Sequence, residues 1–282
     1  MLIKDGCMSS SKELVSYLYT RFPATRFIPL AIFLAAAGLA SASSSHLFPW
    51  VLAVALALTL ILQFRLWDDI ADRDHDQRIH PERVLCHTQN LKPFLTATGI
   101  LFVFNGLVLF WLHDSSFKPI GYLVLCVYLL AWYRLRPITT PVSLLNSHLV
   151  MLKYPVIAWL VGTSAADSDM VLLLPCLFSV YLIFLIFEIL DDTSLGRLPG
   201  AIVSLMASFS FLICVWVFIA FWSRPHTNSA SMAIWPIIIL STLILGISSF
   251  LKLNRQSLIH NGRGFFIVGL LAYLAVAIEK NT

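Results

Sequence analysis

The sequence predicts an all-α polytopic membrane protein, built as a bundle of nine transmembrane helices. Three observations predict this class. Of the 282 residues, 59% are hydrophobic and only 12% are charged, whereas soluble domains carry about 25% charged residues. The mean hydropathy is +0.83. The apolar residues are also gathered into runs of ~17–25 residues, the length of helix that crosses a bilayer.

The nine runs follow one another closely, so we interpret residues 1–282 as a single transmembrane domain. The predicted spans lie near residues 27–43, 49–67, 93–112, 119–135, 141–162, 170–190, 200–222, 233–251 and 263–279.

Residues 1–26 are polar and carry apolar side chains at helical spacing, which predicts a short helix at the membrane interface. The first span also resembles a signal peptide, because Arg21 and Arg26 precede it and small residues follow it. We favour an uncleaved helix, since the bundle needs this span.

The basic residues are distributed unevenly between the two sides of the predicted bundle. Fifteen Lys and Arg residues fall on the side that holds the N-terminus and three on the other. The positive-inside rule therefore predicts a cytoplasmic N-terminus and an outside C-terminus. We expect a multi-pass protein of a bacterial-type inner membrane. The five cysteines are scattered, so neither a disulfide framework nor a cysteine metal site is predicted.

Five aspartates directly follow the second span: Asp68, Asp69, Asp72, Asp74 and Asp76. Three of them recur every four residues, which on a helix turning ~100° per residue places them on one face. Their mutual repulsion needs counter-cations. Arg65, Arg73, Arg78 and Arg83 supply some of this charge, and Mg²⁺, which prefers oxygen ligands, would supply the rest. The alternative is a solvated acidic helix end.

Two further groups of polar residues lie at the same predicted depth. Tyr133, Arg134 and Arg136 end the fourth span before Pro137, and a guanidinium fork suits a diphosphate. Ordinary anchoring by positive charge is the alternative. The sixth span ends with Glu188, Asp191 and Asp192, which can share a helix face, and Arg197 follows them.

Lys153 lies within the fifth span, twelve residues beyond Pro141. A lysine at mid-bilayer is costly unless it faces protein or water. We therefore expect Lys153 to face a central polar cavity, with Asn146 on the same wall, and to pair with a polar or anionic group inside the bundle. A structural ion pair without a substrate role is the alternative.

The segment DDIADRDHD (68–76) resembles the first aspartate-rich motif of the UbiA superfamily of intramembrane prenyltransferases, written NDxxDxxxD. Asp68 takes the place of the family's Asn. The segment FEILDDTSLG (187–196) is similar to the second motif, but Glu188 replaces its first Asp and Leu195 stands where a third carboxylate would. The resemblance implies nine helices around a central cavity that opens to the cytoplasm.

The resemblance and the residues together predict the roles at the site. The expected metal ligands are Asp68, Asp69, Asp72, Asp76, Glu188, Asp191 and Asp192. Those expected to bind diphosphate are Arg73, Arg78, Arg134, Arg136 and Arg197, and those expected to be catalytic are Asp72, Asp76, Tyr133, Arg136 and Lys153.

The predicted function is Mg²⁺-dependent transfer of an isoprenyl group from a prenyl diphosphate to a small, aromatic acceptor in the lipid bilayer, with no nucleic-acid partner. Two alternatives stay open: a terpene cyclase that ionises the diphosphate without an acceptor, and a degenerate member that binds lipid or a partner without catalysis. The chain has no GxxxxGK[ST], GxGxxG, HExxH or GxSxG motif, so those chemistries are not supported.

Overall fold

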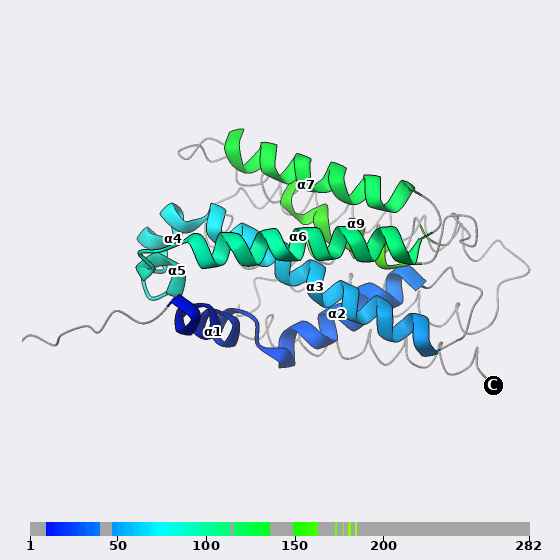
Figure 1. Ribbon diagram of the computed structural model, residues 1–282, viewed down its shortest axis with the longest axis horizontal. Coiled ribbons are helices and arrows are strands. Elements are labelled where there is room, and N and C mark those ends of the chain that lie inside the picture. The colour runs from blue at the N-terminus through cyan, green and yellow to red at the C-terminus, as the bar shows by residue number, and fades with distance from the viewer. Residues whose placement is uncertain are drawn as a thin grey trace, which may run out of the picture.

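The computed structural model describes residues 10–39, 47–113, 116–135 and 149–162, with single positions between 173 and 184. Every regular element within these ranges is a helix (Figure 1). The predicted all-α class is therefore confirmed for this part of the chain. The spans predicted after residue 190 lie outside the described residues, so the count of nine and the central cavity stay predictions.

The helices agree closely with the spans predicted from hydropathy. They are α1 (Ser10–Arg21), α2 (Ala24–Leu39), α3 (Leu47–Ala71), α4 (Arg73–Ile79), α5 (Val84–His87), α6 (Lys92–Leu112), α7 (Phe117–Leu135) and α9 (Lys153–Val161). The first four predicted spans correspond to α2, α3, α6 and α7, and α9 lies within the fifth.

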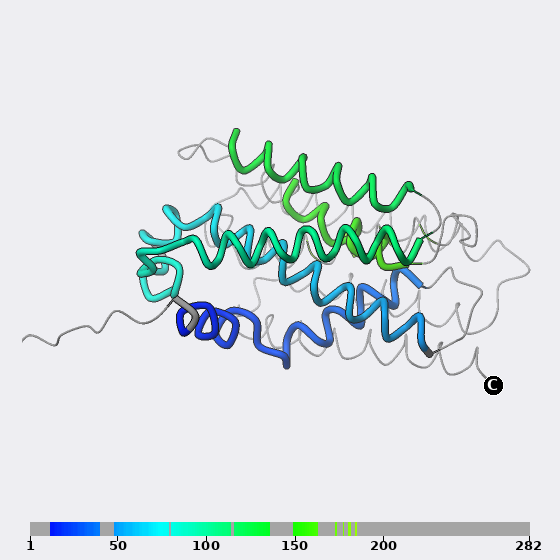
Figure 2. The backbone as a smooth tube through the Cα atoms, viewed as in Figure 1, coloured from blue at the N-terminus to red at the C-terminus, as the bar shows by residue number. Residues whose placement is uncertain are grey.

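Two described helices are long and apolar enough to cross a membrane, Phe48–Ala71 and Lys92–Leu112, with mean hydropathies of 1.9 and 2.0. A third span results if Lys12–Arg21 and Ala24–Leu39, which are bent by 65°, count as one. Figure 2 shows α3 running the length of the described bundle, from beside α2 to α4 at the other end. The protein is therefore a helical membrane protein.

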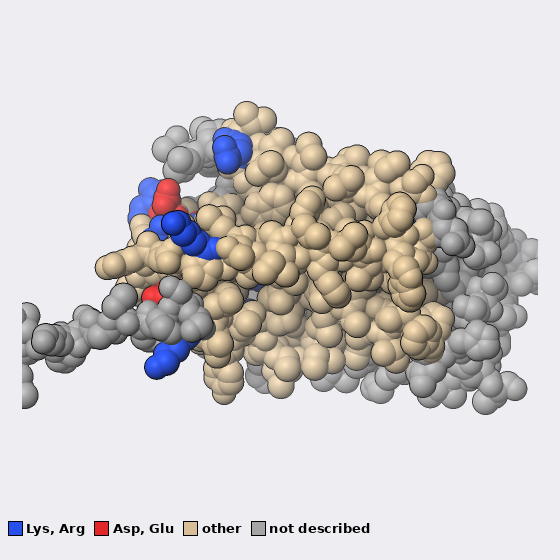
Figure 3. Space-filling model, in the orientation of Figure 1, with Lys and Arg blue, Asp and Glu red and all other residues tan. Residues whose placement is uncertain are grey.

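The outward faces of α6 and α7 are apolar and exposed. On α6 they include Ile100, Val103, Phe104, Leu107, Phe110 and Trp111, and on α7 Ile120, Leu123, Val124 and Val127. Figure 3 shows a broad uncharged side, with the described Lys, Arg, Asp and Glu gathered mainly at the end that holds α4 and α5. A contiguous apolar surface of this kind fits contact with lipid.

Small residues let α2 pack tightly between α3 and α9. Ala35, Ala36 and Ala37 have no exposed surface. A Cβ added to Gly38 would collide with the carbonyl oxygen of Ala158, and one added to Gly162 would collide with that of Gly38. Helix packing in membranes relies on such close backbone approach, because lipid is as apolar as the helices themselves.

Hydrogen bonds among polar side chains join α3, α6 and α7 inside the bundle. Asn105 donates to Oε1 of Gln63 at 2.7 Å, and the Tyr122 hydroxyl donates to the same oxygen at 2.8 Å. All three residues have no exposed surface. Thr59 extends the network by donating to Oδ1 of Asn105 at 2.6 Å. In a membrane each such bond contributes about 0.6–2 kcal/mol, so the network fixes how these helices are aligned.

We predict that Gly38→Ala destabilises the protein by about 1–3 kcal/mol, because the added methyl must separate α2 from α9. Thermal unfolding of the purified protein in detergent measures the effect. Gly99→Ala on α6 is the matched control, since its Cβ meets nothing within 4 Å and alanine favours the helix. Equal melting temperatures for the two variants would contradict the packing described here.

Candidate active site

The aspartate-rich segment continues the helical backbone of α3. The amide of Asp72 donates to the carbonyl of Asp68 at 2.8 Å, that of Asp76 to Asp72 at 2.8 Å, and that of His80 to Asp76 at 2.7 Å. Asp72 itself, at φ −89° and ψ 0°, is the N-cap of α4. The predicted helical spacing of Asp68, Asp72 and Asp76 is thus confirmed, and α3 extends four residues beyond the predicted limit of 67.

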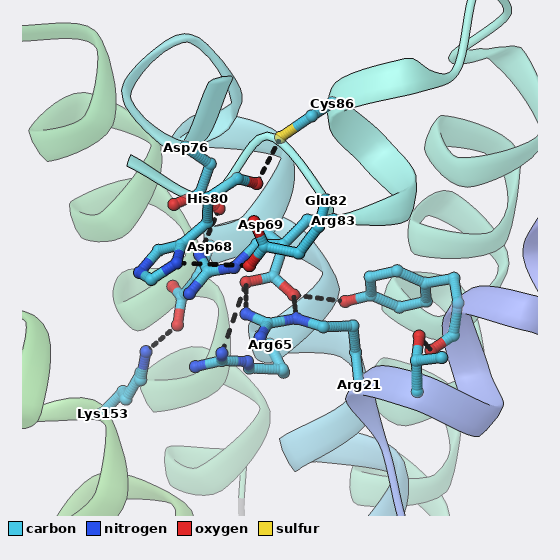
Figure 4. Close-up of polar contacts among 12 residues, drawn as sticks. Arg21, Arg65, Asp68, Asp69, Asp76, His80, Glu82, Arg83, Cys86 and Lys153 are labelled. Atoms are coloured by element: carbon cyan, nitrogen blue, oxygen red, sulfur yellow. Dashed lines mark hydrogen bonds and ion pairs between the residues drawn. The ribbon is translucent and has the colours of Figure 1, made fainter. Parts of the chain in front are cut away.

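Asp68 is held by residues from two other helices (Figure 4). Its Oδ2 forms an ion pair with Nζ of Lys153 on α9, and its Oδ1 accepts a hydrogen bond from the Tyr133 hydroxyl on α7. Asp68 is 7% exposed and Lys153 is 2% exposed. The expectation that Lys153 pairs with a polar or anionic group inside the bundle is confirmed, and the same ion pair fits the alternative of a structural role. Asn146 lies outside the described residues.

Asp69 binds α1 to the end of α3. Arg21 donates to both carboxylate oxygens, at 2.9 and 3.0 Å, and the Tyr17 hydroxyl donates to Oδ2 at 2.9 Å. Arg65 lies 3.5 Å from Oδ1. The contacts span 48 and 52 residues of sequence for Arg21 and Tyr17, so no sequence pattern could have indicated them.

The apolar face of α1 is covered by protein. Tyr17 is 1% exposed and clusters with Leu66, Leu85 and Phe94, meeting the Phe94 ring edge-on at a centroid distance of 5.7 Å. The predicted short helix is confirmed. The structure adds that α1 rests on α3, α5 and α6, and that its polar residues reach the aspartates.

Two arginines form the contacts that hold α4 and α5 together. Arg83 pairs with Oδ2 of Asp76 at 2.5 Å. Arg73 donates to the carbonyls of Leu85 at 2.9 Å and Thr88 at 2.8 Å. Burial and the nearby Asp76 carboxylate raise the pKa of the Cys86 thiol, which favours the neutral form. Of the predicted counter-cations, Arg83 and Arg65 contact aspartates, whereas Arg73 is engaged by backbone carbonyls.

Of the other predicted site residues, three lie within the described ranges and five lie outside them. Arg78 and Arg134 are exposed, and Arg78 donates to the Asp74 carbonyl at 3.3 Å. Asp72 is half-buried between α3 and α4. Outside the described residues lie Arg136, Glu188, Asp191, Asp192 and Arg197.

Within the described ranges, no group of three or more His, Cys, Asp or Glu side chains is arranged to hold a metal ion. Mg²⁺, however, usually takes only one or two protein carboxylates and leaves its other positions to water and phosphate. Asp72 and Asp76 fit this requirement, because they lie one turn apart and Arg83 engages only one oxygen of Asp76. Asp68 and Asp69 fit it less well, since cations or hydroxyls already contact both oxygens of each.

Comparison with known proteins gives a match in structure but none in sequence. No protein-family model matches the chain, and neither does any curated protein. A solved structure, reported in a study of digeranylgeranylglyceryl phosphate synthase in membranes, superposes on 95% of this chain and 99% of its own, with a TM-score of 0.62 and 15% identity. The chain has the fold of that membrane protein.

We predict that Arg21→Gln loosens α1 from α3, because Asp69 loses its two-oxygen partner. Arg21 is 20% exposed, so the expected cost of about 2 kcal/mol is below that for a fully buried pair. Hydrogen exchange of the α1 amides should then become roughly thirtyfold faster. Lys12→Gln, at an exposed position on the same helix, should leave exchange unchanged. Unchanged exchange in Arg21→Gln would show that the ion pair does not hold α1.

Asp68 and Lys153 should behave as a coupled pair. Lys153→Met alone leaves a buried carboxylate without its cation and should cost about 3–5 kcal/mol. Adding Asp68→Asn in the same chain should recover part of that loss, because the remaining amide is neutral. Unfolding free energies of the two single variants and the double variant measure the coupling. Additive losses would mean that the two side chains act independently.

Proposed function

We propose that the protein transfers an isoprenyl group from a prenyl diphosphate to a small acceptor in the membrane, in a Mg²⁺-dependent reaction. The observation that carries this proposal is the position of Asp72 and Asp76. They lie on consecutive helical turns at the charged end of an otherwise apolar bundle. The solved protein with the same fold has a name that describes geranylgeranyl groups joined to a glyceryl phosphate.

In this proposal Asp72 and Asp76 hold the metal from one side, and Glu188, Asp191 and Asp192 are the candidates for the other side. Bound Mg²⁺ would neutralise charge on the diphosphate leaving group. Arg78 and Arg134 are exposed near the ends of α4 and α7 and would contact the phosphate oxygens, together with Arg136 and Arg197. We give Arg73 a different role from that predicted, because two of its donors bind the carbonyls of Leu85 and Thr88.

Asp68 and Asp69 then act as fixed counter-ions. Asp68 orients the side chains of Lys153 and Tyr133, because its two carboxylate oxygens bind the Lys153 ammonium and the Tyr133 hydroxyl at the end of α3. Asp69 holds α1 over the same end through Arg21 and Tyr17. Through these contacts the two carboxylates hold α1, α7 and α9 next to the turn that begins with Asp72, the first proposed metal ligand.

The proposed reaction breaks the bond between the allylic carbon and the diphosphate oxygen, and the electron pair leaves with the diphosphate. The resulting allylic cation is captured by an electron-rich carbon or oxygen of the acceptor, which then loses a proton. Water must be kept from this cation. The apolar helices on which the isoprenoid chain would lie serve that purpose, while Lys153 and the Tyr133 hydroxyl stabilise negative charge at the boundary.

We predict that the purified protein releases diphosphate from geranylgeranyl diphosphate in the presence of Mg²⁺. Asp72→Ala and Asp76→Ala should each lower the rate at least about a hundredfold, because the leaving group loses its charge stabilisation. Asp74→Ala is the matched control, since Asp74 belongs to the same segment and its side chain is exposed. Chelation of the metal should abolish release in the wild type.

Product analysis separates the proposal from other activities. Release that requires an added acceptor supports transfer, whereas a cyclic hydrocarbon or alcohol formed from the diphosphate alone would identify a cyclase instead. Full activity in Asp72→Ala and Asp76→Ala would contradict the metal assignment. No turnover with donors of any chain length would contradict an enzymatic function.

A further inference from the structure

The Asp76 carboxylate, one of the two proposed metal ligands, binds a cation of the protein itself. Nη1 of Arg83 lies 2.5 Å from Oδ2 of Asp76 (Figure 4). Asp76 is 6% exposed, and a carboxylate shielded from water in this way attracts a cation more strongly than one on the surface. The sequence predicted Arg83 only as a counter-cation. The structure places it on a carboxylate that the proposed reaction needs.

Arg83 reaches Asp76 from a turn whose backbone is fixed. It is the N-cap of α5, with φ −69° and ψ 141°. Its amide donates to the carbonyl of His80 at 3.1 Å, and its own carbonyl accepts from the amide of Cys86 at 3.0 Å. Within the described ranges, Asp76 is the only partner of its guanidinium. The Arg83 side chain is 25% exposed, so it can turn away from Asp76 while the backbone stays in place.

The packing of α4 on α5 does not depend on Arg83 alone. Arg73, the first residue of α4, donates to the carbonyls of Leu85 at 2.9 Å and Thr88 at 2.8 Å. These two hydrogen bonds join the helices without using a carboxylate. The ion pair between Arg83 and Asp76 can therefore be exchanged for another contact while α4 and α5 remain together.

A guanidinium on Asp76 opposes the binding of a metal ion there. Two cations on one carboxylate lie only a few ångströms apart, and like charges repel strongly at such a distance in a site shielded from water. A metal ion that binds Asp76 has to displace Arg83, whose guanidinium then loses its anionic partner. This loss weakens the binding of the metal when it arrives alone.

A diphosphate reverses this disadvantage. It is multiply charged, and a guanidinium binds phosphate through two parallel hydrogen bonds. A diphosphate bound to the metal beside Asp76 lies within reach of the displaced Arg83 side chain and replaces the lost carboxylate. Metal and diphosphate then bind more tightly together than either does alone, and by linkage each raises the affinity for the other by the same factor.

We propose that Arg83 competes with Mg²⁺ for Asp76 and thereby makes tight metal binding depend on the diphosphate. This inference rests on the proposed prenyl transfer and describes how its metal site is regulated. The site takes up the metal together with the prenyl diphosphate. Once the diphosphate product leaves, Arg83 returns to Asp76 and the metal is released.

Metal binding without any substrate tests the competition. The purified full chain is titrated with Mn²⁺ alone, and electron paramagnetic resonance measures the free ion. We expect Arg83→Gln to bind Mn²⁺ about tenfold more tightly than the wild type or better. Arg83→Lys, whose shorter side chain pairs less closely with Asp76, should show a smaller rise. If Arg83→Gln is too unstable to purify, Arg83→Lys decides by the direction of its change.

A matched control separates competition at Asp76 from a general effect of charge. Lys92, at the start of α6, is exposed. Lys92→Gln removes one positive charge as Arg83→Gln does, but salt screens an exposed charge of this kind. Its Mn²⁺ affinity should equal that of the wild type.

The dependence on diphosphate is measured with an unreactive thio-analogue of a prenyl diphosphate, titrated with and without excess Mn²⁺. The factor by which Mn²⁺ tightens binding of the analogue should be about tenfold smaller in Arg83→Gln than in the wild type, because the variant has no displaced guanidinium for the phosphate to bind.

Four results would overturn the inference: an unchanged or lower Mn²⁺ affinity in the Arg83 variants, an equal rise in Lys92→Gln, an unchanged factor for the analogue, or no Mn²⁺ binding by any of these proteins. Failure of prenyl transfer itself would appear elsewhere, as absence of diphosphate release by the wild type. The Mn²⁺ affinities would remain readable in that case.

Discussion

The ion pair between Asp68 and Lys153 is the interaction on which this end of the molecule depends. Either charge alone would be unstable inside an apolar bundle, because removing an ion from water costs several kcal/mol. Together they are 7% and 2% exposed, and they join α3 to α9. The Tyr133 hydroxyl on α7 binds the remaining carboxylate oxygen. One aspartate thus fixes the relative positions of three helices that are far apart in the sequence.

Asp69 likewise joins α3 to another helix, in this case α1 near the N-terminus. Its partners Arg21 and Tyr17 lie on α1, so a helix outside the long apolar spans becomes part of the charged end. Both oxygens of Asp68 and of Asp69 are contacted by cations or hydroxyls, and Asp72 and Asp76 follow on the next turns, where Arg83 contacts one oxygen of Asp76. We infer a division of labour along one helix, in which the inner carboxylates assemble the bundle and the outer ones meet the ligand.

Hydropathy and helical spacing predicted those features that depend on local sequence. The limits of α6 and α7 followed from the lengths of their apolar runs, whereas α3 continues to Ala71, past the end of its run. The four-residue spacing of Asp68, Asp72 and Asp76 followed from the period of the helix. Lys153 was expected to pair with a polar or anionic group inside the bundle, because a lysine facing lipid at mid-bilayer is costly. The identity of that anion, Asp68, could not be predicted, since the two residues are 85 positions apart.

Features that depend on packing between distant helices were not predicted. The contact of Gly38 with Gly162, and the network of Gln63, Asn105 and Tyr122, arise only when α2, α3, α6, α7 and α9 meet. Arg73 shows that packing can also occupy a side chain for which the sequence predicted another role. Arg73 was predicted to bind diphosphate, and the structure shows its Nε and Nη2 donating to the carbonyls of Leu85, in α5, and Thr88, which caps α5. A single sequence shows which charges are present, whereas only the fold shows which are already paired.

The most direct test of this division of labour is electron paramagnetic resonance of Mn²⁺, substituted for Mg²⁺, bound together with an unreactive thio-analogue of a prenyl diphosphate. The account predicts phosphorus hyperfine coupling in the wild type and also in the double variant Asp68→Asn/Lys153→Met, since the inner pair does not hold the metal. The signal should be lost in Asp72→Asn. Loss of the signal in the double variant, with binding intact in Asp72→Asn, would contradict the account.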